Sequence, residues 1–161
     1  PIMAIEKAEA VFVGGGNTFV LVATLYQKGL MTPLKTALEG GLLYLGTSAG
    51  GNICGPSMQT TNDMPIVYPA SLETLGSIPF NINAHYLDPD PASSHRGESR
   101  KTRIQEFHVF NELSVLGLRE GSWLQVTGNS IVLKGMHQAP LFQKGKDRID
   151  CNSETDFSFL S

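Results

Sequence analysis

Cysteine is scarce in this 161-residue sequence, and long apolar runs are missing. The two cysteines, Cys54 and Cys151, are too few for a disulfide framework or a zinc site, which favours a reducing, cytoplasmic setting. No apolar run approaches the roughly 18 residues that a membrane-spanning helix needs, so we expect no membrane association. The opening residues 1–4 lack the basic segment of a signal peptide, and secretion is not expected either.

An excess of positive charge is also absent. The 12 lysines and arginines against 15 aspartates and glutamates give a net charge of −3. A nucleic-acid-binding protein needs a basic patch, so a nucleic-acid partner is not expected. Apolar residues make up 41% and charged residues 17% of the chain, which is typical of a globular protein with one core.

The first fifty residues show the pattern of an open α/β sheet. Short apolar runs at 10–13 and 42–45 predict buried parallel strands, and each is followed by a glycine-rich turn. Between them, Asn17 is a typical N-cap for a helix to about residue 30, and Pro33 fits the first turn of a second helix to residue 39. The order strand, helix, helix, strand predicts the α/β class.

The remaining residues predict a functional loop, one more helix and several short strands. Residues 55–80 lack periodicity, and a loop of this length in a compact domain is usually functional. A helix is expected at 99–110. Alternating apolar residues, separated by turns such as Gly128-Asn129, predict strands and hairpins at 80–84, 115–118, 123–126, 130–133 and 140–142.

The segment Gly46-Thr47-Ser48-Ala49-Gly50 matches the G-x-S-x-G pattern of a nucleophile elbow. It directly follows a predicted buried strand and precedes a predicted helix, as such an elbow requires. The turn points the serine hydroxyl outward near a helix N-terminus, where backbone N–H groups favour negative charge. We therefore expect Ser48 to be a nucleophile; the alternative is an ordinary turn serine.

A serine nucleophile needs a base, and the sequence contains four histidines. His85 ends the strand predicted at 80–84, and strand ends are where the sites of α/β sheets gather. His95, in a polar loop, is the second candidate. His108 lies in a helical pattern beside two phenylalanines and is expected to be a packing or a surface residue. His137 lies in a turn-like segment.

A third, acidic group should orient the imidazole ring. Asp63 lies in the long loop after the elbow, and its alternative role is to cap a turn. Glu120 follows a predicted strand, and its alternative is an exposed turn residue. Asp88 and Asp90 lie near a pair of prolines and are expected to shape their loop.

The earlier glycine turn, residues 14–16, is not a dinucleotide fingerprint because it lacks the G-x-G-x-x-G spacing. It can instead donate a backbone N–H group to an oxyanion hole together with the amide of Ala49; the alternative is a tight turn only. The histidines have no metal-ligand spacing. We therefore expect neither a cofactor nor a metal ion.

Five short motifs follow one another through nearly the whole chain. They are Val13-Gly14-Gly15-Gly16-Asn17-Thr18-Phe19, Gly46-Thr47-Ser48-Ala49-Gly50, Thr60-Thr61-Asn62-Asp63-Met64-Pro65-Ile66, Asn83-Ala84-His85-Tyr86 and Gly97-Glu98-Ser99-Arg100. In this order they resemble peptidase E, a family of cytoplasmic α-aspartyl dipeptidases. The resemblance implies an α/β fold with a three-layer, open, mostly parallel sheet and helices on both faces, related to class I glutamine amidotransferases.

The resemblance also implies a serine peptidase that hydrolyses dipeptides with an N-terminal aspartate. Matched motif by motif, Ser48 would be the nucleophile and His85 the general base. Both Asp63 and Glu120 match acids of the family, and which of them bonds the His85 ring stays open. The oxyanion hole would come from the amides of Gly16 and Ala49.

Recognition of the substrate aspartate needs a cation, and arginine suits a planar carboxylate better than lysine. Arg100 matches the Gly-Glu-x-Arg stretch of the family. Arg103, one helical turn further on, is the alternative, and the simplest role for either is a solvated helix face.

The sequence departs from the family in one large respect. The family has further strands and helices before the residue 14–16 turn, and they are absent here. Residues 1–161 would then form a single α/β hydrolase domain, the C-terminal two-thirds of a longer catalytic domain, with a companion N-terminal fragment or a cleaved precursor that covers exposed apolar surface. Removal of an initiator Met before Pro1 is the simpler reason for the opening residue. Whether two copies form a homodimer stays open.

Two other functions remain as alternatives. The first is a cyanophycinase-like hydrolase of β-aspartyl-arginine linkages, which the position and number of substrate-facing arginines would distinguish. The second is a catalytically idle α/β binding module that keeps the elbow without using it. Retention of Ser48, His85 and two candidate acids argues against the second.

Overall fold

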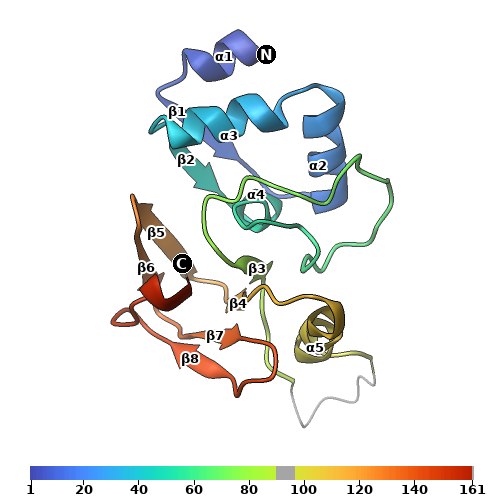
Figure 1. The fold of residues 1–161 in the computed structure, drawn as a ribbon, viewed down its shortest axis with the longest axis vertical. Coiled ribbons are helices and arrows are strands. Elements are labelled where there is room, and N and C mark those ends of the chain that lie inside the picture. Colours follow the sequence, from blue (N-terminus) through green and yellow to red (C-terminus); the bar gives the residue numbers. More distant parts are fainter. Residues whose placement is uncertain (90–96, 161) are drawn as a thin grey trace. The chain divides into compact units, whose positions relative to one another are not determined.

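The computed structural model of the protein describes residues 1–89 and 97–160, which form two compact units, Pro1–Ile82 and Asn83–Ser161 (Figure 1). The N-terminal unit contains α1 (Ile2–Glu6), β1 (Ala10–Val13), α2 (Thr18–Gln27), α3 (Met31–Glu39), β2 (Leu43–Gly46) and α4 (Ala49–Asn52). Strand β3 (Asn81–Ala84) crosses the boundary. The C-terminal unit contains α5 (Arg100–Phe110), β4 (Val115–Leu118), β5 (Ser122–Thr127), β6 (Ser130–Gly135), β7 (Ala139–Phe142), β8 (Ile149–Cys151) and a 3-10 turn (Ser158–Leu160).

In the N-terminal unit, β1 and β2 pair in parallel, with Ala10 opposite Leu43 and Val13 opposite Gly46. This confirms the predicted parallel pairing of the first two strands. Because parallel strands end at the same edge, the turns that follow them meet there. The N–H group of Thr47 donates to the Val13 carbonyl at 3.0 Å, which ties the second turn to the end of β1.

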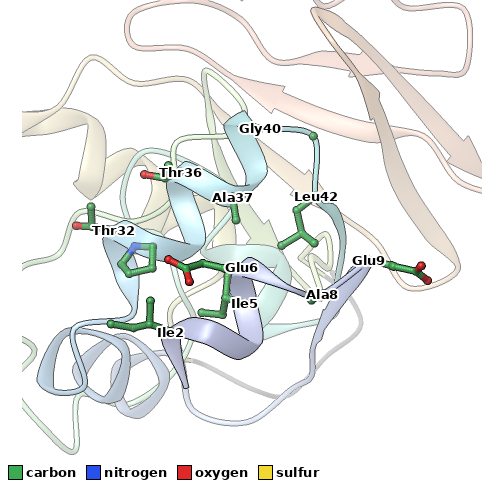
Figure 2. A pocket seen from close by; sticks show the side chains of 12 residues that line it. Ile2, Ile5, Glu6, Ala8, Glu9, Thr32, Thr36, Ala37, Gly40 and Leu42 are labelled. Atoms are coloured by element: carbon green, nitrogen blue, oxygen red, sulfur yellow. The ribbon is translucent and has the colours of Figure 1, made fainter.

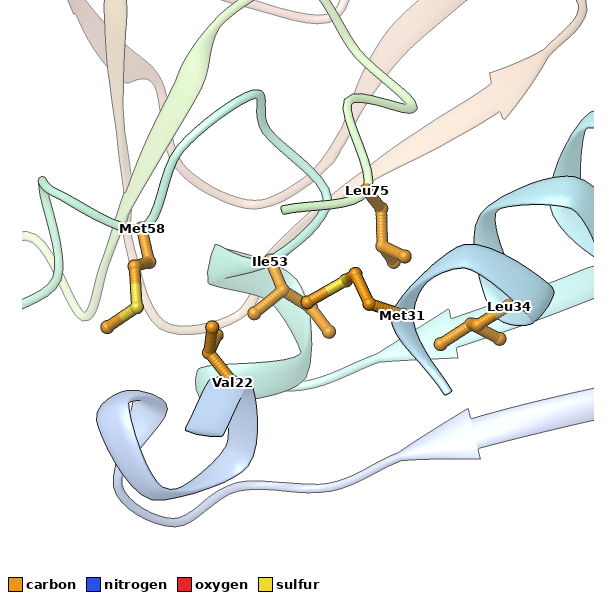
Figure 3. Close-up of a cluster of buried hydrophobic side chains, with 6 residues drawn as sticks. All are labelled: Val22, Met31, Leu34, Ile53, Met58 and Leu75. Atoms are coloured by element: carbon orange, nitrogen blue, oxygen red, sulfur yellow. The ribbon is translucent and has the colours of Figure 1, made fainter. Parts of the chain in front are cut away.

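The core of the N-terminal unit consists of apolar side chains from the helices and from the long loop that follows α4. Figure 3 shows this cluster, which contains Val22, Met31, Leu34, Ile53, Met58 and Leu75. Met58 and Leu75 both come from the loop predicted at 55–80. An isolated bridge between Ser57 and Glu73 also closes this loop. The loop is therefore packed into the unit, which fixes the chain between the elbow and β3.

The prediction that β1 and β2 are buried strands is wrong. Val11, Val13 and Tyr44 pack against the core cluster, but the alternate residues point the other way. The residues Phe12, Leu43 and Leu45 are 67%, 59% and 55% exposed. Successive side chains of a strand point to opposite faces, so only one face of this two-stranded sheet is packed.

In the C-terminal unit, β3, β4, β7 and β8 form one sheet, in which β4–β7 and β7–β8 are antiparallel. Strands β5 and β6 form the hairpin predicted around Gly128-Asn129, with Thr127 opposite Ser130. Buried Tyr86, Ile104, Val115 and Phe142 make up a second core cluster. Strand β8 is an addition to the predicted strands.

The described strands thus form three separate small sheets in a mixed α/β arrangement. The three-layer open sheet and the relation to glutamine amidotransferases stay predictions. No helix within residues 1–89 and 97–160 is long and apolar enough to cross a membrane.

Candidate active site

Ser48 occupies the turn between β2 and α4 in a backbone conformation that side chains rarely adopt, with φ 52° and ψ −112°. In the part of the chain that the structure describes, Ser48 and His85 are the only non-glycine residues with a positive φ. Such a conformation costs on the order of 1–3 kcal/mol and persists only where the surroundings enforce it. The elbow therefore has the strained serine that its sequence pattern predicts.

Two glycines make the elbow sterically feasible. A Cβ atom at Gly50 would lie 2.1 Å from the Val13 carbonyl oxygen, and one at Gly46 would lie 2.5 Å from the Gly50 carbonyl oxygen. Both distances are far shorter than a van der Waals contact. The first and last positions of G-x-S-x-G therefore exclude any side chain, because β1, β2 and α4 approach one another too closely here.

The carbonyl group of Gly50 is held by two half-buried side chains. The Tyr44 hydroxyl donates to it at 2.8 Å and the Cys54 thiol at 3.5 Å. Burial raises the pKa of Cys54 to about 12, although its hydrogen bond with Tyr44 acts in the opposite direction. The thiol is thus protonated at neutral pH and is no rival nucleophile, because the thiolate is the reactive form.

The glycine turn after β1 lies against the Ser48 side chain. A Cβ atom at Gly15 would lie 3.4 Å from the Ser48 Cβ and 3.7 Å from its Oγ. The next residue, Gly16, has a φ of 135°, which favours glycine. Ala49 is the first residue of α4, where N–H groups have no acceptor within the helix. The structure therefore brings the turn of Gly16 and the first turn of α4 to Ser48.

Asp63 interacts with the start of α2. Its Oδ2 atom accepts hydrogen bonds from the Thr18 N–H at 2.6 Å and from the Thr61 hydroxyl at 3.1 Å. The predicted N-cap, Asn17, is also confirmed, since its side chain accepts from the Val20 N–H at 3.2 Å. An acidic group at a helix N-terminus is stabilising, so the observed contacts give Asp63 a helix-capping role.

His85 directly follows β3, has a φ of 55°, and contacts Glu120. The bond joins the His85 Nδ1 atom to the Glu120 Oε1 atom. A carboxylate accepts, so Nδ1 carries the proton and donates, and Nε2 keeps the lone pair that a general base needs. Of the two acids that the sequence left open, Glu120 is the one at this ring nitrogen.

A group of charged side chains surrounds Asp88, and we call Tyr86, Asp88, Arg119 and Arg148 the Asp88 cluster. Arg119 and Arg148 each donate to the Asp88 carboxylate at 2.5 Å, and the Tyr86 hydroxyl donates at 3.3 Å. Burial opposes ionisation of Asp88, but hydrogen bonds and positive charge from both arginines outweigh it and lower its pKa. The sequence predicted a loop-shaping role for Asp88 and did not indicate either arginine. The position of Arg119 directly before Glu120 is the signal that could have indicated Arg119.

The two candidate substrate-binding arginines differ in their contacts. Ser99 caps α5 by accepting from the Thr102 N–H at 3.1 Å, and Arg100 is the first residue of the helix. Arg103 lies 3.8 Å from the Glu98 carboxylate, whereas Arg100 has no ion-pair partner among the described residues. Burial, and to a lesser degree the charge of Arg103, lowers the pKa of Arg100.

Two further histidines, His108 and His137, make other contacts. His108 is buried and its Nε2 contacts the Leu113 carbonyl at 3.0 Å, so of its two predicted roles the structure shows packing. His137 lies between β6 and β7, where its carbonyl accepts from the Ser122 hydroxyl at 3.2 Å. His95 and Asp90 fall outside the described residues. Within residues 1–89 and 97–160, no group of three or more His, Cys, Asp and Glu is arranged to hold a metal ion.

A hollow of about 660 Å³ lies elsewhere in the N-terminal unit, beside α1 and α3 (Figure 2). Ile2, Ile5 and Leu42 supply apolar surface, and Glu6 and Glu9 are its acids. None of the candidate site residues lines it, so it gives no support to the proposed chemistry.

Comparison of this sequence with known proteins identifies relatives that match most of the chain. A sequence model of peptidase family S51 matches residues 2–134. The chain is 57% identical over 145 residues to a protein named Peptidase E from Streptomyces coelicolor, covering 90% of this chain and 60% of that protein. It is 47% identical over 158 residues to a protein named Probable alpha-aspartyl dipeptidase from Drosophila melanogaster, covering 98% and 66%.

The fold agrees with these sequence matches. A solved structure of a protein from Listeria monocytogenes EGD-e superposes with a TM-score of 0.66 at 22% identity, over 84% of this chain and 63% of that one. The chain thus spans about three-fifths of the length of the proteins it matches, with the elbow, the His85 segment and α5 all inside the matched range. By its sequence, the chain belongs to peptidase family S51.

Proposed function

We propose that this chain carries the catalytic residues of a serine peptidase that hydrolyses dipeptides with an N-terminal aspartate. The observation that carries the proposal is the strained backbone of Ser48, held between β2 and α4 by glycines that tolerate no side chain. A chain without a use for this serine would relieve the strain with glycine. The name of the Drosophila relative, Probable alpha-aspartyl dipeptidase, points to the same substrate class.

In the proposed reaction, the Ser48 Oγ attacks the peptide carbonyl carbon while His85 Nε2 takes the hydroxyl proton. The N–H groups of Gly16 and Ala49 stabilise the negative charge on the tetrahedral carbonyl oxygen. His85 then gives its proton to the departing amine, which leaves an aspartyl ester on Ser48. Water hydrolyses this ester by the same steps in reverse. The pairing of Ser48 with His85 rests on their complementary chemistry and on the family resemblance.

Among the two candidate acids, we assign the orienting role to Glu120. It contacts the Nδ1 atom of His85, and this contact selects the tautomer with a basic Nε2. For Asp63 we propose a supporting role, because its carboxylate caps α2 directly after the glycine turn that contains Gly16. Loss of Glu120 should lower kcat itself, whereas loss of Asp63 should act mainly through stability of the turn.

Between the two arginines, we assign the substrate aspartate to Arg100. It is partly buried at the start of α5, and no described carboxylate pairs with it. A partly desolvated guanidinium without a partner is ready for a planar carboxylate, which it can bind through two hydrogen bonds. Arg103 is more exposed and already lies beside Glu98, so it is the weaker candidate.

The test is hydrolysis of Asp-Leu against Leu-Asp and Glu-Leu, with β-aspartyl-arginine as a fourth substrate. We expect cleavage of Asp-Leu alone, and a loss of roughly 10⁴-fold or more in kcat for Ser48→Ala. Ser77→Ala, an exposed serine with ordinary backbone, is the matched control and should keep full activity. Equal cleavage of all three α-linked dipeptides would overturn the Arg100 assignment, and preference for the β-linked substrate would favour a cyanophycinase-like enzyme.

The proposed setting is the cytoplasm, where the free thiols of Cys54 and Cys151 stay reduced. We also propose that further polypeptide, such as the expected companion N-terminal fragment, covers the exposed side chains of Phe12, Leu43 and Leu45. Three large apolar residues on one face of a two-stranded sheet form the kind of surface that proteins usually cover.

A further inference from the structure

We propose that Asp88 and Arg119 are positioning residues that hold His85 and Glu120 in register with each other. The inference rests on the proposed function for the roles of the histidine and the glutamate. Its structural basis is independent of the substrate, because the Asp88 cluster links the two segments that carry this pair.

The His85–Glu120 pair cannot fix its own geometry. The two side chains are 49% and 76% exposed, and a contact this open to solvent holds its partners only weakly. Glutamate also has several rotatable bonds, so a contact with the ring costs side-chain entropy. The backbone segments that carry the two residues must therefore be held together by other contacts.

The ion pair between Asp88 and Arg119 supplies such a contact. Asp88 lies three residues after His85, and Arg119 directly precedes Glu120. The Arg119 guanidinium donates to the Asp88 carboxylate at 2.5 Å and also to the Gln138 carbonyl. Its side chain is the least exposed among the arginines of the described ion pairs. An ion pair shielded in this way is screened less by solvent than the pair it supports.

Tyr86 adds two further links between the same segments. Its N–H group donates to the Leu118 carbonyl at 3.0 Å, and the Arg119 guanidinium lies 5.6 Å from the centre of its ring. The ring is fully buried against Gly117, where a Cβ atom would lie 2.6 Å from it. Residues 86–88 and 117–119 are thus joined by a backbone hydrogen bond, a cation–π contact and an ion pair.

Arg148 holds the Asp88 carboxylate from a second side. It donates to Asp88 at 2.5 Å and to Asp150 at 2.7 Å. With both oxygens of Asp88 engaged by arginines, the carboxylate has one orientation. Asparagine at position 88 could replace one of these acceptors but would lose the charge. The arrangement therefore depends on an ionised Asp88 and on a planar guanidinium at position 119.

The test combines activity with an NMR signal of the His85 ring in the purified protein. The Nδ1–H proton bonded to Glu120 should give a downfield resonance, assigned by its loss in Glu120→Gln. We expect Asp88→Asn to broaden or remove this resonance and to lower kcat on Asp-Leu by roughly 10- to 100-fold, the cost of a catalytic group displaced by about 1 Å, with KM little changed. Asp88→Glu should restore part of the resonance and part of the lost kcat. Circular dichroism checks that each variant is folded.

Two comparisons separate positioning from a general effect on the fold. In a Glu120→Gln background, Asp88→Asn should lower kcat by less than about twofold, because the contact it positions is already gone. Glu112→Gln breaks the exposed ion pair with Lys144 in the same unit and should change neither readout. Equal losses of kcat with and without Glu120, or a resonance unchanged in Asp88→Asn, would overturn the inference.

The failure of the proposed function would look different. A wild-type protein that shows the downfield resonance but cleaves no Asp-Xaa dipeptide would refute the substrate assignment. Loss of the resonance in Asp88→Asn, and its retention in Glu112→Gln, would still support positioning of the His85–Glu120 pair.

Discussion

At the scale of single residues, a strained backbone is found at two residues that the proposed chemistry uses. Ser48 and His85 have φ values of 52° and 55°, and each follows the last residues of a strand. The positive φ of Ser48 could be predicted, because G-x-S-x-G after a buried strand is the pattern of a strained turn. That of His85 could not, because no turn pattern around residue 85 calls for a positive φ.

Our first prediction concerns the last glycine of the elbow. Gly50→Ala would place a Cβ atom 2.1 Å from the Val13 carbonyl oxygen, and we expect it to destabilise the protein by about 1–3 kcal/mol or more. Gly51→Ala is the matched control in the same helix, since its Cβ would meet nothing closer than 3.8 Å and alanine favours helices. Urea unfolding measures both. Equal stabilities of the two variants would contradict the steric account of the elbow.

Our second prediction concerns the strain at Ser48 itself. Ser48→Ala and Ser48→Gly both remove the nucleophile, but only glycine adopts the observed φ and ψ without steric cost. We therefore expect the glycine variant to be more stable than the alanine variant by roughly 1 kcal/mol. At Ser77, which lacks a positive φ, the order should reverse, because glycine there only adds freedom to the unfolded chain. Thermal unfolding of the four variants would show whether the two positions differ in this way.

At the scale of elements, local signals predicted the ends of helices better than the burial of strands. Asn17 caps α2 as predicted, because a cap is a contact within four residues that a local pattern can reveal. The helix expected at 99–110 is observed as α5, with Ser99 as its cap. Burial of β1 could not be predicted, since an apolar run does not reveal whether a second layer covers it. Strand β8 has three residues, which are too few for a periodic signal, and among the described strands it pairs with β7.

Our third prediction concerns the start of α5. Ser99→Ala removes the hydroxyl that accepts from the Thr102 N–H, and we expect a loss of about 1 kcal/mol in the stability of the first turn. Because Arg100 is the first residue of this helix, KM for Asp-Leu should rise while kcat changes less. Ser99→Asp keeps a capping oxygen and should behave like the wild type. Hydrogen exchange of the α5 amides reports the fraying directly, and similar exchange in both variants would count against the capping role.

At the scale of the whole chain, the contacts that define the candidate site join residues far apart in sequence. Asp63 contacts Thr18 across 45 positions, His85 contacts Glu120 across 35, and Arg148 contacts Asp88 across 60. Residue types, spacings and the family resemblance indicated Ser48, His85 and both acids as candidates, but they did not indicate Arg119 or Arg148. They could not show which acid meets the His85 ring, because that depends on how β3 and the turn before β5 are brought together within the C-terminal unit.

The last prediction concerns the exposed face of β1 and β2. If further polypeptide or a second copy covers this face, each large apolar side chain buried there contributes about 1.5–3 kcal/mol to association. We therefore expect the double variant Phe12→Ser and Leu45→Ser to weaken any such assembly by at least roughly tenfold per side chain. It should also bind less of a dye that reports exposed apolar surface. Phe110→Ser, which changes a still more exposed aromatic at the end of α5, is the control and should leave association unchanged. Sedimentation over a range of concentrations, with and without the N-terminal portion of a family member, measures the effect. Identical association of the double variant and the wild type would show that this face stays open to solvent, and the proposal of a covering segment would then be wrong.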